Sequence, residues 1–106
     1  MCGINGILIK HPSIKKIINL MSVITQRRGP DNEGFYIDEN LCVALAHNRL
    51  SIIDLSGDAN QPMFSEDCRY ILIFNGEIYN YKELKKLYNI NFKNLNFKMD
   101  KTTSNV

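Results

Sequence analysis

The chain opens with Met1-Cys2-Gly3-Ile4-Asn5-Gly6-Ile7-Leu8-Ile9 (MCGINGILI), and this stretch decides the expected fold. From Gly3 onward it is apolar and rich in β-branched residues, which predicts a buried strand that starts almost at the N-terminus. Cys2 stands directly before that strand. Because cysteine is small, we expect Met1 to be removed, which leaves a thiol and a free α-amine on one residue. A terminal amine can serve as the base for such a thiol; the alternative is a small buried apolar residue.

Helical spacing of apolar residues follows the first strand. It predicts an amphipathic helix over residues 14–26, with Ser13 as its N-cap. Turn-forming residues at 29–32 end that segment. Two extended stretches, 35–37 and 41–46, then predict a hairpin.

The second half of the chain begins with a short β-like piece at residues 51–55 and continues through a loop. Residues 70–74 (YILIF) are apolar throughout and predict a central strand. Asn80 and Glu83 form the pattern of a capping box for a helix over residues 81–88. Strands predominate and the helices do not alternate regularly with them, so the pattern favours an α+β fold.

The composition limits both the size and the class of the protein. A chain of 106 residues with 44% hydrophobic and 23% charged residues forms one domain at most. Its net charge of +2 comes without a clustered basic stretch, so we expect no nucleic-acid partner. Three cysteines without CxxC spacing argue against a disulfide framework and against a metal site. No apolar run is long enough to cross a membrane and no signal peptide is recognised, so we expect a reducing cytoplasm.

Asn75-Gly76 ends the predicted strand over residues 70–74. The Asn side-chain amide and the Gly N–H can point at one spot and form an oxyanion hole for a tetrahedral acyl intermediate. A hairpin turn is, however, the commonest meaning of the Asn-Gly dipeptide. From the dipeptide alone both interpretations stay open.

Two charged residues could bind the two ends of an amino acid. Arg49 can hold a carboxylate through two parallel hydrogen bonds, although an ion pair with Asp31 or Asp54 is the simpler interpretation. Glu77 can hold an ammonium group, or it is only a surface acid. His47 is interpreted as a structural histidine, because the α-amine of Cys2 already supplies a base.

Five motifs occur in one order along the chain: Cys2-Gly3-Ile4, Arg28-Gly29-Pro30-Asp31, HNRLSIID from His47, Gln61-Pro62 and NGEIYN from Asn75. Together they resemble the N-terminal glutamine amidotransferase domain of glutamine-hydrolysing asparagine synthetases, a class II domain of the N-terminal-nucleophile (Ntn) hydrolase type. The resemblance covers essentially the whole chain. It implies an αββα sandwich of mostly antiparallel sheets, of which residues 1–106 would form only the N-terminal part, with the synthetase domain absent.

The resemblance also implies a reaction. Cys2 attacks the carboxamide of glutamine, which gives a γ-glutamyl thioester and ammonia, and water then releases glutamate. Asn75 and Gly76 hold the oxyanion in the catalytic set. The implied glutamine-binding residues are those same two together with Arg49, Leu50, Ser51, Ile52, Ile53, Glu77 and Asn105. Asn105 stands where the family has Asp, and the loss of that charge is expected to weaken glutamine binding.

What lies beyond this domain is implied in the same way. Ammonia would pass to a synthetase domain or chain in which ATP and Mg²⁺ serve to activate aspartate, while the amidotransferase domain itself needs no cofactor. The acceptor is not determined by this stretch of sequence, and the resemblance allows a homodimer. The alternative function is a truncated, non-catalytic remnant that acts as a binding module or has no function.

Overall fold

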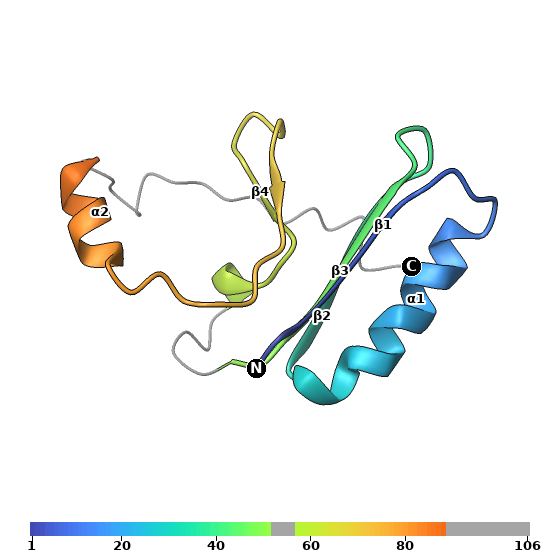
Figure 1. Ribbon diagram of the computed structural model, residues 1–106, viewed down its shortest axis with the longest axis horizontal. Coiled ribbons are helices and arrows are strands. Elements are labelled where there is room, and N and C mark those ends of the chain that lie inside the picture. The colour runs from blue at the N-terminus through green and yellow to red at the C-terminus, as the bar shows by residue number, and fades with distance from the viewer. Residues whose placement is uncertain (52–56, 89–106) are drawn as a thin grey trace.

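The structure is a computed structural model that describes residues 1–51 and 57–88. It contains helices and antiparallel strands, which confirms the predicted α+β class (Figure 1). In chain order the elements are β1 (Gly3–Leu8), α1 (Ile14–Thr25), the 3₁₀ helix η1 (Gln26–Arg28), β2 (Asn32–Asp38), β3 (Val43–Arg49), the 3₁₀ helix η2 (Gly57–Ala59), β4 (Met63–Phe64), β5 (Ile71–Leu72) and α2 (Tyr81–Leu87).

The main sheet has three antiparallel strands in the order β1-β3-β2. The hairpin of β2 and β3 confirms the prediction, and β1 pairs with the other edge of β3, so that Ile4 lies opposite His47. β3 continues to Arg49, three residues past the predicted end of this strand. The polar residues His47, Asn48 and Arg49 are buried there. A prediction based on apolar residues therefore ended the strand too early.

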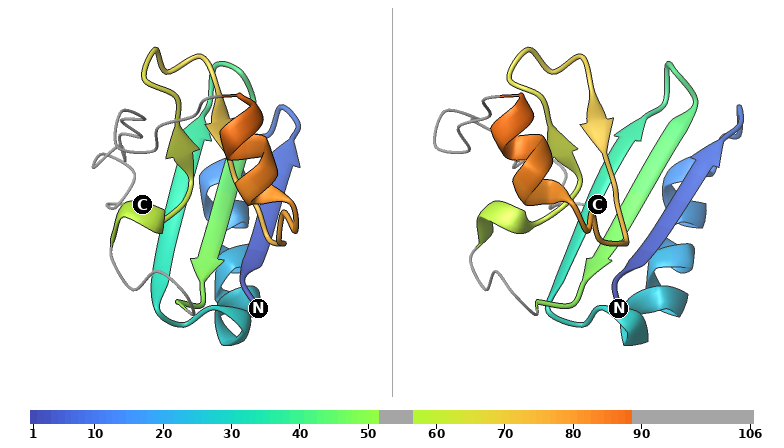
Figure 2. Two further views of the ribbon diagram at one scale, coloured as in Figure 1. Left: turned by 90° about the vertical axis from the view of Figure 1, so that its left-hand side faces the viewer. Right: turned by 60° about the vertical axis from the view of Figure 1, so that its left-hand side comes forward.

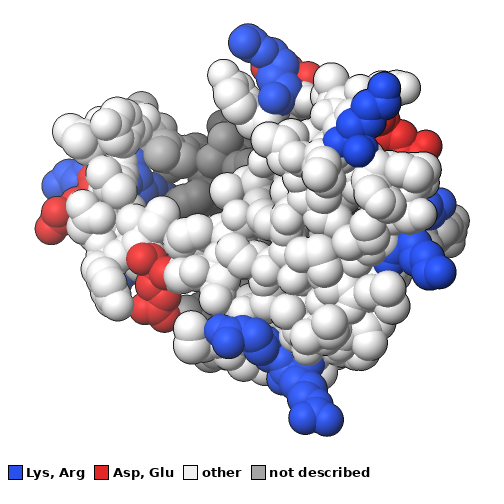
Figure 3. Space-filling view, turned by 45° about the vertical axis from the view of Figure 1, so that its right-hand side comes forward, with Lys and Arg blue, Asp and Glu red and all other residues white. Residues whose placement is uncertain are grey.

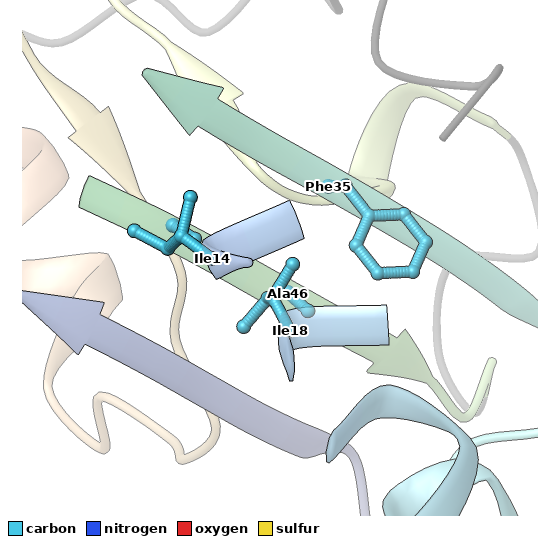
Figure 4. Packing of buried hydrophobic residues seen from close by; sticks show 5 residues of the cluster. Ile14, Ile18, Phe35 and Ala46 are labelled. Carbon is cyan, nitrogen blue, oxygen red and sulfur yellow. The ribbon is translucent and has the colours of Figure 1, made fainter. Parts of the chain in front are cut away.

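Helix α1 covers one face of this sheet and builds the core with it (Figure 4). Ile14 and Ile18 of the helix pack against Phe35 of β2 and against Ala44 and Ala46 of β3. The two alanines are two positions apart on β3 and therefore point to the same face of the sheet, where their small side chains leave room for the helix. Full burial of each isoleucine stabilises the fold by about 1.5–3 kcal/mol.

A buried polar network continues this core toward the C-terminal end of α1. Asn48 of β3 is completely buried, and its Nδ2 donates to Oγ of Ser22 at 3.0 Å. Oγ1 of Thr25 donates to Oδ1 of Asn48 at 2.6 Å, and Ser22 donates to the Glu33 carboxylate at 3.1 Å. These hydrogen bonds join α1, β2 and β3 at the end of the sheet where β3 reaches Arg49.

The second, two-stranded sheet lies on the face of the main sheet opposite α1 (Figure 2). Tyr36 of β2 meets Phe64 of β4 edge to face, with ring centroids 5.8 Å apart. Because Tyr36 follows Phe35, which packs under α1, the two rings must leave β2 on opposite faces. Gly34 allows the closest approach, since a Cβ there would lie 2.0 Å from the Gln61 carbonyl oxygen. No glycine of the described ranges has a positive φ, so Gly34 serves close packing rather than a special backbone angle.

The prediction of a strand over residues 70–74 is confirmed only for its middle, and the central position in a sheet is wrong for the described residues. Only Ile71 and Leu72 pair, as β5 against the two-residue strand β4, and the side chains of Tyr70, Leu72 and Phe74 are exposed. Apolar character predicted burial, but in the described residues β5 has a single neighbouring strand. The predicted β-like piece at 51–55 lies almost wholly outside the described residues.

The helix boundaries agree with the predicted ones, but the caps do not. Asn80 occupies the N-cap position of α2 without a side-chain cap hydrogen bond, so the predicted capping box with Glu83 is wrong. Ser13 occupies the N-cap of α1, also without a side-chain cap bond, and its N–H donates to Nδ1 of His11 at 3.0 Å. In the described ranges every helix falls short of the length and apolar character that crossing a bilayer requires.

Candidate active site

A cleft of about 530 Å³ lies where the end of β3 faces the segment that follows β5. It collects residues that are more than seventy positions apart in the sequence. The predicted catalytic residues Cys2, Asn75 and Gly76 all line it, as do the predicted binding residues Arg49, Leu50 and Glu77. The remaining lining residues are Met1, His47, Ala59, Gln61, Phe74 and Tyr79.

The thiol of Cys2 meets the backbone of the residue that follows β3. The N–H of Leu50 donates to the Cys2 sulfur at 3.3 Å, and the sulfur lies 3.9 Å from the Leu50 carbonyl oxygen. A main-chain N–H directed at the sulfur can donate to a thiolate, which is the nucleophilic form of cysteine. On the other side, Nε of Arg28 donates to the Cys2 carbonyl at 3.3 Å. Backbone pairing of β1 with β3 therefore places the sulfur at the cleft.

Arg49 enters the cleft from the last position of β3. Its side chain is only 6% exposed, and Nη1 donates to Oδ1 of Asn60 at 2.7 Å. Asp31, one of the two acids considered as its ion-pair partner, contacts the main chain of this segment. The Asp31 N–H donates to the Arg49 carbonyl at 2.9 Å, and the Asp31 carboxylate accepts the Ser51 N–H at 2.7 Å.

The turn that carries Asp31 wraps closely around the end of β3. A Cβ added to Gly29 would lie 2.1 Å from the Asn48 carbonyl oxygen, so only glycine fits there. Gly29 and Asp31 belong to the RGPD motif, and the structure gives both a role in holding residues 48–51. The motif therefore supports the wall of the cleft and contributes none of its lining residues.

The segment after β5 is held by a side chain from the preceding loop. Nε2 of Gln61 donates to the Phe74 carbonyl at 3.1 Å, and Oε1 of Gln61 accepts the Phe74 N–H. Asn75 and Gly76 follow at once, and Glu77 is exposed at the rim. The polypeptide runs on to α2 rather than returning as a strand, so Asn75-Gly76 is not a hairpin turn between two strands of the described chain.

His47 forms part of the cleft wall and is completely buried. Burial lowers the pKa of His47, the nearby backbone of Phe74 opposes this in part, and the charge of Arg49 lowers the pKa further. In the described chain neither ring nitrogen completes a hydrogen bond. The imidazole is therefore neutral near pH 7 and adds no charge to the cleft.

Sequence reasoning assigned no role to Asn60, which contacts Arg49, or to Gln61, which lines the cleft. The lining residues Ala59, Phe74 and Tyr79 were not assigned either. The Gln61-Pro62 motif was a signal, but nothing in its pattern indicated a contact with Phe74. Ser51 lies beside the cleft and its N–H is taken by Asp31. The predicted binding residues Ile52, Ile53 and Asn105 lie outside the described residues.

Other kinds of site find little support in the described ranges. No group of three or more His, Cys, Asp and Glu side chains there is placed to hold a metal ion. All three cysteines are free thiols. Figure 3 shows the Lys and Arg side chains of one face at separate points rather than in one basic patch. The cleft combines a thiol, candidate N–H donors for an oxyanion and side chains of both charges, an arrangement suited to acyl transfer from a small zwitterion.

Comparison with known proteins finds one matching family model and several relatives. The family model of the glutamine amidotransferase domain matches residues 1–104. The chain is 41% identical to a putative glutamine-hydrolysing asparagine synthetase 2 of Methanocaldococcus jannaschii, over 85% of this chain and 21% of the relative. It is 43% identical to asparagine synthetase 1 of Bacillus subtilis (81% and 14%) and 40% identical to asparagine synthetase B of Escherichia coli (83% and 16%), both glutamine-hydrolysing. The chain thus spans only 14–21% of the length of these relatives.

Proposed function

Because the chain belongs to the glutamine amidotransferase domain family, we propose that it releases ammonia from glutamine through the thiol of Cys2. One observation carries the proposal: Cys2, Arg49 and the Asn75-Gly76 pair line a single cleft. Four of the five motifs contribute residues that line the cleft, and the fifth, RGPD, supports the main chain around Arg49.

The nucleophile forms when Met1 is removed. Met1 is 71% exposed, so an aminopeptidase can reach it, and because it also lines the cleft its loss enlarges the space beside the sulfur. The new α-amine of Cys2 takes the proton of the thiol. The Leu50 N–H, 3.3 Å from the sulfur, then stabilises the thiolate that attacks.

In the first step the sulfur bonds to the carboxamide carbon of glutamine, and the carbonyl oxygen becomes an oxyanion. The side-chain amide of Asn75 and the N–H of Gly76 donate to that oxygen. The intermediate collapses, the α-ammonium of Cys2 gives its proton to the leaving nitrogen, and ammonia departs from a γ-glutamyl thioester. Water then attacks the thioester, and glutamate leaves as the thiol is restored.

Substrate recognition uses opposite charges at two sides of the cleft. Arg49 takes the α-carboxylate of glutamine beside Leu50, and Ser51, Ile52 and Ile53 serve as further glutamine-binding residues. Glu77 contacts the α-ammonium, with Asn105 as a neutral hydrogen-bond partner. The buried Arg49 is held in place by Asn60, so the carboxylate meets an oriented guanidinium.

The wider setting follows from the same family. We propose that residues 1–106 are part of an αββα sandwich, in which α1, the main sheet and the β4–β5 sheet are successive layers (Figure 2). Ammonia passes to a synthetase domain or chain that uses ATP and Mg²⁺ for the synthesis of asparagine or a related amide. We place this reaction in the cytoplasm.

The test is release of ammonia and glutamate from glutamine by the full 106-residue chain, with removal of Met1 verified by intact mass. Cys2→Ala should abolish the activity, and Asn75→Ala should lower kcat by about 10²- to 10³-fold, the usual effect of removing one oxyanion donor. Cys68→Asn is the matched control, because Cys68 is an exposed thiol with a φ of 57° that Asn tolerates. Activity that survives Cys2→Ala would refute the proposal. Failure of a glutamine-analogue electrophile to label Cys2 would favour a non-catalytic binding module.

A further inference from the structure

We propose that Asn60 and Gln61 act together as a positioning pair that aligns the two halves of the cleft for the reaction. Asn60 orients the arginine that takes the carboxylate of the substrate, and Gln61 holds the main chain that presents the oxyanion donors. This inference rests on the proposed glutaminase function. It joins the contact of Asn60 with Arg49 to a new role for Gln61, which is to position the main chain that carries the oxyanion donors.

The Gln61 side chain makes the two backbone hydrogen bonds with Phe74 that a neighbouring strand would otherwise make. A carboxamide carries one donor and one acceptor, as a backbone peptide group does. Nε2 of Gln61 donates to the Phe74 carbonyl at 3.1 Å, and Oε1 accepts the N–H of the same residue. Both backbone groups of Phe74 are therefore fixed at once. The next peptide units belong to Asn75 and Gly76, so their position depends on this hold.

Gln61 itself is fixed against the main sheet. A Cβ at Gly34 would come within 2.0 Å of the Gln61 carbonyl oxygen, so the loop main chain lies directly on β2. Pro62 follows and is buried, and Met63 begins β4. The amide of Gln61 thus projects from a rigid base, which is what a positioning residue requires.

Asn60 acts on the other half of the cleft. Its Oδ1 accepts from Nη1 of Arg49 at 2.7 Å, and its N–H donates to the Gly57 carbonyl at 3.1 Å, which fixes the turn that carries it. Arg49 is almost fully buried, so this hydrogen bond restricts a guanidinium within the wall of the cleft. Because Asn60 and Gln61 are adjacent, one loop sets the spacing between the carboxylate-binding group and the oxyanion donors.

The two residues should affect different kinetic constants. Gln61→Met keeps the length of the side chain and removes both hydrogen bonds, so the main chain at Asn75 loses its alignment with the reacting carbonyl. A displacement of about 1 Å at a reacting group costs about 10²-fold in rate. Asn60→Leu removes the hydrogen bond from Nη1 of Arg49, so the guanidinium is oriented less strictly and the change should act on binding instead.

The experiment is covalent labelling of Cys2 by a glutamine-analogue electrophile in the full chain without Met1, followed by mass spectrometry. We expect Gln61→Met to lower the labelling rate constant about 10- to 100-fold while the apparent binding constant stays within about 3-fold. We expect Asn60→Leu to raise the binding constant about 10-fold with the rate constant within about 3-fold. Gln26→Met is the matched control, since it makes the same chemical change on an exposed side chain.

Amide hydrogen exchange of Phe74 tests the hydrogen bonds between Gln61 and Phe74 independently of the reaction of Cys2. The Phe74 N–H should exchange faster in Gln61→Met than in the wild type, while the amides of β3 keep their protection, which also shows that the variant is folded. Equal Phe74 exchange in both proteins overturns the proposal, as does a pair of variants that change both constants in the same proportion. Wild-type labelling that excess glutamine does not slow means that the proposed function itself has failed, and the positioning role fails with it.

Discussion

His47 should make the stability of this protein depend on pH in a way that one substitution removes. The residue is completely buried in β3, and burial lowers its pKa, with a partial opposing effect of the Phe74 backbone and a further lowering by the charge of Arg49. In the unfolded chain the imidazole returns to its ordinary pKa of 6.5. The perturbation is a shift of pH from neutral to acid, with His47→Gln as the comparison.

The sign follows from counting protons. Below pH 6.5 the unfolded state binds a proton at His47, while the native state binds one only below its lowered pKa. The free energy of unfolding therefore falls as the pH drops from 6.5, and it stops falling from this cause below the native pKa. A difference of one bound proton corresponds to a slope of about 1.4 kcal/mol per pH unit, which is the upper limit of the effect.

The assay is urea unfolding at a series of pH values between 7.5 and the acid limit of folding. The slope of the unfolding free energy below pH 6.5 should be smaller in His47→Gln than in the wild type. An imidazole NMR titration of the wild type checks the cause directly and does not need a stable variant. An unchanged slope in His47→Gln, or a native pKa of His47 at or above 6.5, would refute the reasoning.

Three further predictions concern the packing that holds the cleft. Gly29→Ala should lower the free energy of unfolding by about 1–3 kcal/mol or more, because its Cβ would lie 2.1 Å from a backbone oxygen. Gly6→Ala should cost far less, since its nearest atom is a side-chain carbon at 3.5 Å; urea midpoints that rank the two in the opposite order contradict this. Asn48→Leu should destabilise by about 1–3 kcal/mol because it leaves buried polar groups unpaired, and a neutral effect in the same assay would show that the network contributes nothing. Ile18→Ala, at a fully buried position, should cost about 2–5 kcal/mol, against roughly 0.5 kcal/mol or less for Ile24→Ala, which is 78% exposed, as measured by thermal unfolding.

The first half of the fold was accessible from local patterns in the sequence. The β-branched run after Cys2, the helical spacing from Ile14 and the turn residues at 29–32 each predicted an element that the structure contains. Periodicity works here because each element buries one face, so the spacing of apolar residues reports its geometry. The C-terminal end of β3 was not predicted, because its last residues are polar and buried. Burial of polar groups depends on partners that are distant in sequence.

The chemical roles proposed for the candidate site could likewise be inferred from single residues of the sequence. Cysteine at position 2, Arg49 and Asn75-Gly76 are residue types that suit a thiol nucleophile, the binding of a carboxylate and the binding of an oxyanion. Only the tertiary structure decided that they line one cleft, because that requires β1 to pair with β3 and the segment after β5 to lie across the same end. The apolar run at 70–74 predicted a longer, central strand for the same reason. At Phe74 the backbone N–H and carbonyl bond the side chain of Gln61 instead of a neighbouring strand. Residue types are a local property of the chain, whereas hydrogen-bond partners are settled by which distant groups the packed elements bring into reach.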